Sequence, residues 1–267
     1  MNCTASTAKQ VRPPSRLEHL RDLLLVLTQK EIKVRYKNSW LGYVWSVAHP
    51  LAFALVYFIA FGLFLRVDIP NYTLFLITGL FAWHWLANSI ASSPNIFLSN
   101  STLLKKVRFP HHTLVAAMVF NDGFHYLVSV PVITAFLAVY GIAPSWVWLI
   151  GIPGLTVAQF LLTYGLALAI ASINLFFRDL ERLTSLLVMF LFFLTPIVYS
   201  EAMVPPAFRS VLYLNPFSPV ILGWRHLFLS SHLDWTLLGV GYAHALVAVG
   251  LGMLVYRSLR WRFAEVV

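Results

Sequence analysis

The sequence predicts an all-α integral membrane protein. It would have six transmembrane helices, an N-terminal amphipathic interface helix, and short external re-entrant or gate helices between the fifth and sixth spans. Three observations lead to this fold class. Hydrophobic residues make up 59% of the 267 residues and charged residues only 11%, whereas soluble domains keep about a quarter of their residues charged. Six apolar runs approach or exceed the length of a membrane helix. The basic residues gather at the ends of these runs, as they do beside membrane helices.

The polar segment 1–15 is expected to be a flexible cytoplasmic leader, and residues 16–267 are expected to form one transmembrane domain. The leader contains no apolar stretch, so the sequence does not predict a cleaved secretory signal there. Cys3 is the one cysteine of the chain. A disulfide framework and a cysteine metal site are therefore excluded.

The segment 16–37 predicts a helix that lies in the membrane interface. Leucines between Leu17 and Leu27 recur at helical spacing, and Arg and Lys residues fall on the opposite face. The segment carries too many charges to cross a bilayer. Amphipathic rings favour the headgroup boundary, and the rings expected there are those of Trp40, Tyr43 and Trp45.

The six predicted spans cover residues 41–65, 72–98, 113–139, 147–176, 184–199 and 235–257. Between the last two spans, residues 201–234 are apolar but contain four prolines. One straight helix is excluded there, because each proline removes a backbone donor and clashes with the preceding turn. We expect short helices that dip into one face of the membrane, since non-helical backbone at membrane depth needs cover from protein or water.

The distribution of basic residues predicts the orientation of the chain. Sixteen Lys and Arg residues flank one set of span ends, against three on the other side, which are Arg66, Arg209 and Arg225. Both termini are therefore predicted to be cytoplasmic and residues 201–234 external. The same placement explains the formal charge of +9 as membrane flanking rather than nucleic-acid binding.

Two predicted cytoplasmic loops, at residues 99–110 and 174–185, are short and charged. Positive flanking of membrane helices accounts for the bases of the first loop. The second loop mixes both signs of charge, in Arg178, Asp179, Glu181 and Arg182. Mixed charges on a short helix suit docking to a partner protein better than membrane anchoring.

Asp122, with Asn121 and His125 beside it, is the ionisable group within the predicted spans that most invites a functional interpretation. A carboxylate in the membrane is costly and must face protein or water. Proton coupling is one interpretation. Packing between helices, with an Asp122–His125 pair one helical turn apart, is the interpretation we favour.

Aromatic residues are dense in the second and fifth predicted spans. Their ordinary role is helix packing or lipid contact. The functional alternative is a pore whose ring faces stack against sugar C–H surfaces, much as ring faces attract other polarised partners. Such a pore would let a long polymer slide without one tight site. The channel candidates are Phe81, Trp83, Trp85, Phe190, Phe193 and Tyr199.

Four stretches resemble a known family. They are EIKVRYKNSWLGYVWSVAHPL (residues 31–51), INLFFRDLERL (173–183), TPIVYS (195–200) and YLNPFSPV (213–220). Through them, nearly the whole chain from about residue 17 resembles the membrane subunits of ABC-2 type polysaccharide exporters, in particular the O-antigen and teichoic-acid exporter permeases.

The resemblance implies a channel-forming transport subunit rather than an enzyme, located in the bacterial cytoplasmic (inner) membrane. The chain would act as a homodimer bound to two copies of a separate ABC ATPase subunit, which would bind ATP and Mg. The implied cargo is a glycan linked to undecaprenyl diphosphate, and no cofactor is expected in this chain. No G-x-x-x-x-G-K-[ST] loop occurs in the sequence, so ATP binding through such a loop is excluded here.

The resemblance also implies roles by position. The expected ATPase-coupling residues are Ser101, Leu104, Lys105, Lys106, Arg108, Phe109, Arg178, Asp179, Glu181 and Arg182. The residues expected at the channel entrance and near the lipid diphosphate are Arg35, Lys37, Trp40, Leu41, Gly42, Tyr43 and Trp45. The residues expected in the external gate are Pro205, Pro206, Asn215, Pro216 and Pro219.

Other functions stay open at this stage. An ABC-2 permease for capsule or for a small hydrophobic substrate would share these features. A membrane acyl- or glycosyltransferase could use His111, His112 or Asp122, although the histidine pair has no acidic partner nearby in the sequence and no large catalytic loop is present. A proton-coupled secondary transporter usually has more spans or internal repeats.

Overall fold

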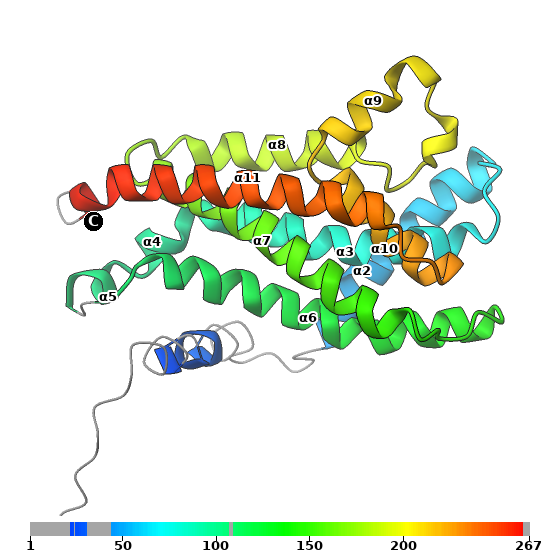
Figure 1. Cartoon of the computed structure of the whole chain (residues 1–267), viewed down its shortest axis with the longest axis horizontal. Helices are drawn as coiled ribbons and strands as arrows, with labels where there is room; N and C mark the ends of the chain where they lie inside the picture. Colours follow the sequence, from blue (N-terminus) through cyan, green and yellow to red (C-terminus); the bar gives the residue numbers. More distant parts are fainter. Residues whose placement is uncertain (1–21, 24, 31–43, 107–108, 264–267) are drawn as a thin grey trace, which may run out of the picture.

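The structure, a computed structural model, describes residues 22–23, 25–30, 44–106 and 109–263, and these residues form helices joined by turns and short loops (Figure 1). The parts of the predicted interface helix that lie within these ranges, residues 22–23 and 25–30, are helical. Leu27 is buried there, whereas Leu25 and Val26 are exposed. No strand occurs in the described ranges, so the all-helical fold class is confirmed.

Five helical segments of the described chain are long and apolar enough to cross a membrane: Val47–Phe64, Tyr72–Ser99, His112–Val139, Trp148–Asn174 and Trp235–Arg262. The first is formed by α2 (Val44–Tyr57) and the π-helix η1 (Phe58–Phe64). The second is formed by α3 (Tyr72–Ser92), η2 (Ser93–Asn95) and α4 (Ile96–Ser99). The others are α6 (His112–Val139), α7 (Trp148–Asn174), and α11 (Trp235–Leu259) with η4 (Arg260–Arg262).

The fifth predicted span, residues 184–199, differs from the prediction. Its helix α8 covers Leu180–Leu194, which is only 15 residues. At 1.5 Å per residue such a helix is about 22 Å long, short of the roughly 30 Å hydrocarbon core. The helix ends where Thr195 becomes extended just before Pro196, because a residue that precedes proline is biased away from the helical conformation.

The interior of the bundle is built around α3. Most of α3 is buried, and it contacts α2, α6, α7, α8 and α10 (Ser218–Ser230). A second close pairing joins α7 to α11 along much of their length. It depends on two glycines, since a Cβ atom added to Gly252 would lie 2.1 Å from the backbone oxygen of Gly165. Close backbone approach at small residues is how membrane helices pack against each other.

Residues 195–234 form short pieces, as the prolines predict. After the non-helical segment 195–200 come η3 (Glu201–Met203), α9 (Pro206–Leu214) and α10. Pro206 and Pro219 stand in the first turns of α9 and α10, where proline is tolerated because no intrahelical donor is lost. Figure 1 shows α9 projecting beside one end of the bundle.

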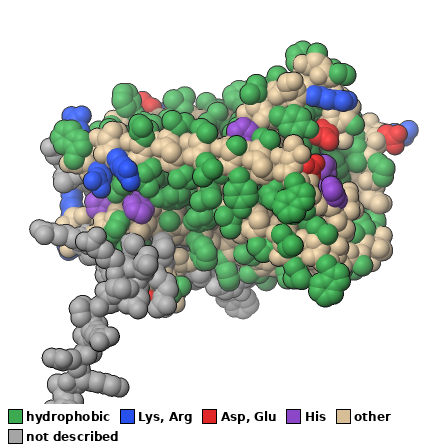
Figure 2. Space-filling view, viewed as in Figure 1, with side chains coloured by type: hydrophobic (Ala, Val, Ile, Leu, Met, Phe, Trp, Pro, Cys, Tyr) green, Lys and Arg blue, Asp and Glu red, His purple; other side chains and the backbone are tan. Residues whose placement is uncertain are grey.

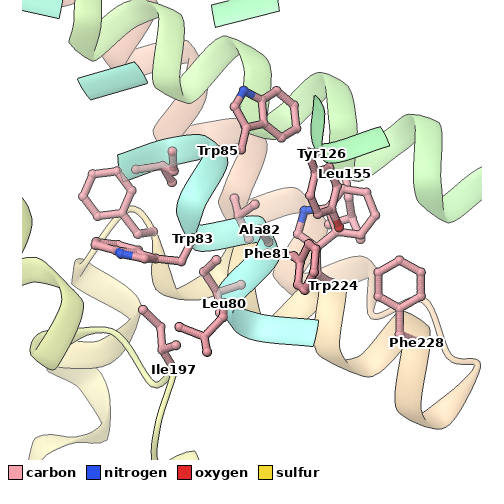
Figure 3. Close-up of a cluster of buried hydrophobic side chains, with 14 of the residues drawn as sticks. Leu80, Phe81, Ala82, Trp83, Trp85, Tyr126, Leu155, Ile197, Trp224 and Phe228 are labelled. Atoms are coloured by element: carbon pink, nitrogen blue, oxygen red, sulfur yellow. The ribbon is translucent and has the colours of Figure 1, made fainter. Parts of the chain in front are cut away.

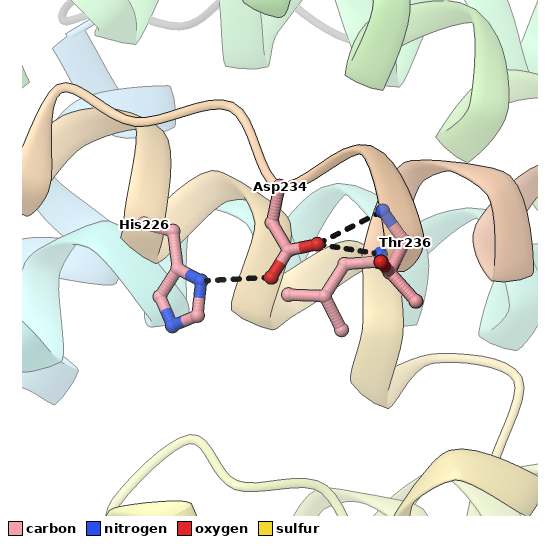
Figure 4. Close-up of polar contacts among 4 residues, drawn as sticks. His226, Asp234 and Thr236 are labelled. Carbon is pink, nitrogen blue, oxygen red and sulfur yellow. Dashed lines mark hydrogen bonds and ion pairs between the residues drawn. The ribbon is translucent and has the colours of Figure 1, made fainter.

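Lys and Arg side chains gather at one end of the bundle, whereas the opposite end carries charges of both signs, as Figure 2 shows on the face it presents. At the end where α5 (Ser101–Lys106) and η4 lie, here called the basic end, the described bases include Lys105, Lys106, Arg178, Arg182, Arg257 and Arg260. The opposite end carries Asp68, Glu201 and Asp234. There Asp234 caps α11 by accepting from the backbone N–H groups of Thr236 and Leu237, and lies 3.9 Å from His226 Nδ1 (Figure 4).

Candidate coupling surface and transport path

The first expected coupling segment begins with α5, and Asn100 joins α5 to the preceding helix α4. The amide of Asn100 donates to the backbone oxygen of Ile96 at 2.8 Å, and its oxygen accepts a hydrogen bond from Lys30. Lys105 and Lys106 are exposed at the end of α5. Of the other expected residues, Ser101, Leu104 and Phe109 are half-buried, and Arg108 lies outside the described residues.

The second expected coupling segment is the turn between α7 and α8. Arg178, Asp179, Glu181 and Arg182 are all exposed there, and they line a surface depression of about 720 Å³ together with Ser185 and Leu186. The charged groups of this turn are therefore free to meet another protein. Its mixed charges favour a partner with charges of both signs.

The two coupling segments are joined through the protein interior. The side-chain amide of Asn174, at the end of α7, donates to the backbone oxygen of Pro94 at 2.9 Å. Phe263, only 2% exposed, lies with its ring centroid 5.2 Å from that of Phe97 and 6.4 Å from that of Phe176. Side-chain contacts thus connect α4 with the turn that precedes α8.

The two histidines proposed for a membrane enzyme lie at this basic end among aromatic residues. His111 stacks on Phe263, with 6.2 Å between ring centroids, and burial lowers the pKa of its imidazole. His112 Nδ1 lies 3.2 Å from the hydroxyl of Tyr164. Among the described residues, no group of three His, Cys, Asp or Glu side chains could hold a metal ion. These contacts favour packing as the role of the histidines.

Asp122 takes part in a contact between helices. Ser89 on α3 donates a hydrogen bond to the Asp122 carboxylate on α6 at 2.7 Å, and both residues are buried. A buried carboxylate must be hydrogen-bonded to be tolerated. The structure thus gives Asp122 an interhelical packing contact.

Most of the expected entrance residues lie outside the described residues: Arg35, Lys37, Trp40, Leu41, Gly42 and Tyr43. Trp45 is described and lies in the first turn of α2, where its side chain is 54% exposed. An exposed ring at the start of the first long segment agrees with the expected boundary position.

Three expected channel aromatics are in the core of the protein. Phe81, Trp83 and Trp85 are at most 4% exposed and belong to the cluster around α3 (Figure 3). Trp85 donates to the backbone oxygen of Val119 at 3.1 Å, and its ring occupies the space that a side chain at Gly123 would fill. Their assignment to the channel wall is therefore corrected, because the protein's own helices surround them.

The aromatics on α8 are placed differently. Phe190 and Phe193 are 60% and 56% exposed, so they are accessible from outside the protein. Tyr199 is half-buried just beyond the helix. Phe192, which lies between Phe190 and Phe193 in the sequence, stacks on Tyr57 of α2 with 5.2 Å between ring centroids.

Sequence reasoning missed a row of rings along α2 and η1. His49, Phe53, Tyr57 and Phe61 follow one another at intervals of four residues, with successive ring centroids 5.0, 6.3 and 6.1 Å apart. Their spacing in the sequence could have revealed this row, because residues four apart share a helix face. These residues, here called the aromatic stripe, are exposed or half-buried. Through Tyr57 and Phe192 the stripe adjoins α8.

The expected gate residues organise the end of the bundle opposite the basic end. Asn215 donates from its amide to Thr195 Oγ1 at 2.9 Å and accepts from the backbone N–H of Phe217. Pro205 and Pro206 set the start of α9, while Pro219 is buried in the first turn of α10. Pro216 lies in the link between α9 and α10. These residues determine where the short helices begin.

Comparison with known proteins identifies the family. The family model described as ABC-2 type transporter matches residues 22–229. The chain belongs to the ABC-2 type transporter family. Two O-antigen export system permease proteins RfbA from Klebsiella pneumoniae are each 44% identical to this ABC-2 chain over 250 residues, covering 94% of the chain and 96% of the relative.

More distant relatives also align along most of this ABC-2 chain. The O-antigen export system permease protein RfbA of Myxococcus xanthus is 31% identical, covering 96% of the chain and 99% of that protein. The polysialic acid transport protein KpsM of Escherichia coli is 22% identical, covering 86% of the chain and 90% of that protein. The resemblance to ABC-2 exporter permeases found from the residues is confirmed.

Proposed function

We propose that the chain is the channel-forming permease subunit of an ATP-driven exporter that moves a lipid-linked, O-antigen-like polysaccharide across the cytoplasmic membrane. The observation that carries this proposal is the 44% identity, over nearly the full length of both chains, to proteins named as O-antigen export permeases. The partly exposed aromatic stripe agrees with a glycan cargo, since ring faces would attract the polarised C–H groups of sugars much as they attract cations.

The proposed topology has six crossings with both termini in the cytoplasm. Five segments are long and apolar enough to span the bilayer, and in this proposal α8 with the segment 195–200 provides the remaining crossing, between α7 and α11. The basic end then faces the cytoplasm, in agreement with the bias of Lys and Arg toward that side. The short helices α9 and α10 lie at the external side, with the buried α10 re-entering the protein interior.

The proposed transport path runs between two copies of the chain. Both α2 and α8 carry many exposed apolar residues, among them Val56, Leu187 and Phe190. In a homodimer, part of this surface would meet the second copy and the aromatic stripe would face the path. The polymer, linked to undecaprenyl diphosphate, would enter at the basic end and leave beside α9.

The proposed energy source is a separate ABC ATPase, present in two copies, which would bind ATP and Mg. The chain itself would carry out no chemistry. The ATPase would dock on α5 and on the charged turn before α8, where Lys105 and Arg178 are exposed. ATP binding can shift the permease between two states only if the two states bind ATP with different affinities. By contacting both coupling segments, the ATPase would transmit this difference in ATP affinity to the permease.

Charge reversal at the coupling turn tests this function. We expect the double change Arg178→Asp and Asp179→Arg to reduce both co-purification of the ATPase and the amount of surface polysaccharide. Arg209→Asp, an exposed change at the opposite end, is the matched control and leaves co-purification unaltered. Normal export and normal ATPase binding by the double variant would contradict the docking assignment. A wild-type chain that purifies without any ATPase would contradict the exporter function itself.

Capsule export is the second candidate, supported by the 22% identity to a polysialic acid transport protein. The higher identity to O-antigen permeases favours the first candidate. Mass spectrometry of the glycan that accumulates on its lipid carrier when the chain is deleted distinguishes the two. An undecaprenyl-linked O-antigen-like repeat supports the first function, and a capsular polymer supports the second.

A further inference from the structure

The chain after α8 leaves the helix while still inside the protein. Residues 195–198 are buried but not helical. The carbonyl groups in this segment therefore lack the regular partners that a helix supplies. Buried backbone oxygens without partners are costly, most of all at membrane depth. The oxygen of Thr195 accepts from the backbone N–H of Ile197 at 2.7 Å, and the hydrogen bonds of the other carbonyls must come from side chains of other elements.

Arg225 and Tyr72 supply these hydrogen bonds. Arg225 Nη1 donates to the oxygen of Pro196 at 2.7 Å, and Nη2 donates to the oxygen of Ile197 at 3.0 Å. The hydroxyl of Tyr72, from the start of α3, donates to the oxygen of Val198 at 2.8 Å. Three consecutive carbonyls are thus held from α10 and α3.

The guanidinium of Arg225 is itself fixed in position. Arg225 is only 5% exposed, and its Cζ lies 3.5 Å from the centroid of the Phe75 ring. Stacking on a ring and donating from a planar fork are both particular to arginine. Among the described residues, no carboxylate forms an ion pair with it. Its hydrogen bonds are therefore directed to the backbone of one short segment, while Glu201 acts on it electrostatically without a direct ion pair.

The residue beside Arg225 anchors α10 in the core. Trp224 donates from its indole N–H to Gln159 Oε1 at 2.7 Å, and Gln159 donates to the backbone oxygen of Ala82 at 2.8 Å. This network joins α10 to α7 and α3, and all its side chains are fully buried. From this fixed helix, Arg225 holds the segment that connects α8 to η3 and α9.

We infer that Arg225 is a positioning residue for the external gate. By holding the carbonyls of Pro196 and Ile197, it keeps the end of α8 and the following helix α9 in the arrangement of this structure, which we assign to a closed exit. The coupling turn lies at the other end of the same helix α8, so a displacement that starts there reaches the segment held by Arg225. This inference rests on the proposed export function.

Two substitutions disturb this contact from different elements. Arg225→Gln removes the paired donors. Gly79→Ala on α3 places a Cβ atom 2.8 Å from Arg225 Nη2, with the next atoms no closer than 3.7 Å. The guanidinium is the end of a flexible side chain, so Gly79→Ala displaces it without a clash between backbones, and its hydrogen bonds to the oxygens of Pro196 and Ile197 weaken. Gly154→Ala, whose new Cβ meets only ordinary contacts at 3.7 and 3.9 Å, is the matched glycine control. Arg66→Gln is the matched arginine control, since Arg66 is exposed and lies outside the gate segment.

The experiment measures leakage through the membrane and export in the same cells. Variants are expressed with the ATPase partner in a host that lacks its own copy of the chain and lacks a lactose permease. Leakage is measured as hydrolysis of externally added o-nitrophenyl galactoside by cytoplasmic β-galactosidase, and export as surface polysaccharide. The melting temperature of each purified variant shows whether the fold is intact.

We expect Arg225→Gln and Gly79→Ala to raise leakage about tenfold, which corresponds to a shift of about 1.4 kcal/mol between closed and open exits. The melting temperature of Gly79→Ala should fall less than that of Arg225→Gln, because Gly79→Ala keeps the guanidinium inside the protein. If Arg225 had a purely structural role, Arg225→Gln would lower the melting temperature without raising leakage. Leakage of Gly79→Ala equal to that of Gly154→Ala would overturn the inference, even if Arg225→Gln fails to insert. Failure of the wild-type chain to restore export would instead contradict the proposed function.

Discussion

The contact between α7 and α11 makes a quantitative prediction about stability. A Cβ atom on Gly165 would lie 2.3 Å from the carbonyl carbon of Ala248 and 2.4 Å from the backbone nitrogen of Val249. Ordinary carbon contacts begin near 3.5 Å, so Gly165→Ala requires the two helices to separate by about 1 Å. Backbone atoms cannot move aside as a side chain can. The strain therefore spreads along the whole helix pair.

The expected loss follows from two opposing effects. Inserting a methyl group into a tightly packed interior costs about 1–3 kcal/mol. Replacing a helical glycine by alanine gains up to about 1 kcal/mol in helix propensity. Gly250→Ala, on α11 where the new Cβ meets no atom within 4 Å, shows the propensity gain alone. We expect Gly165→Ala to be about 1–3 kcal/mol less stable than Gly250→Ala.

Thermal unfolding of the purified chain in one detergent measures this difference. For a chain of this size about 1 kcal/mol corresponds to a shift of roughly 2–4 °C, so Gly165→Ala should melt several degrees below Gly250→Ala. Gly252→Ala should behave like Gly165→Ala, because its Cβ would lie 2.1 Å from the oxygen of Gly165. The double variant should lose less than the sum, since both changes open one contact. Equal melting of Gly165→Ala and Gly250→Ala would refute the reasoning.

Three further predictions concern the path, the core and the basic end. Tyr57→Ala should reduce surface polysaccharide at unchanged ATPase co-purification, whereas Tyr57→Phe, which keeps the ring, should export normally; equal export by both would exclude a stacking role. Gln159→Leu leaves the Trp224 N–H without a partner and should lower the free energy of unfolding by about 1–3 kcal/mol, which thermal melting measures. Burial lowers the pKa of His111, so the unfolded chain binds more protons below about pH 6.5. The stability that this neutral imidazole contributes should therefore be lost as the pH falls, and wild-type melting should decline more than that of His111→Gln between pH 7.5 and 5.5.

The sequence predicted those parts of the fold that depend on local composition. Apolar length located the long helices, and Pro205 and Pro206 predicted the break before α9. The length of α8 was not predicted, because the apolar run continues to residue 199 while Thr195 and Pro196 already end the helix. The number of membrane crossings therefore depends on whether the buried non-helical segment after α8 completes the crossing that α8 begins.

At the candidate site, the sequence could least predict the directions in which side chains point. The density of aromatic residues around Trp83 and Trp85 gave no information about which face of α3 the rings occupy, and nearly every face of α3 is covered. Likewise, Arg225 was counted among the external loop bases, yet its side chain points into the protein. Its partners are backbone oxygens nearly thirty residues earlier in the chain, and no local pattern indicates such a contact.

The close pairing of α7 with α11 has a consequence for how the chain is made. Ribosomes release α7 well before α11, since 60 residues separate Asn174 from the first residue of α11, Trp235. Until α11 is inserted, the glycine face of α7 has no helix beside it. The nascent bundle therefore stays incomplete through most of synthesis, and a chain truncated before Trp235 would leave this face of α7 uncovered.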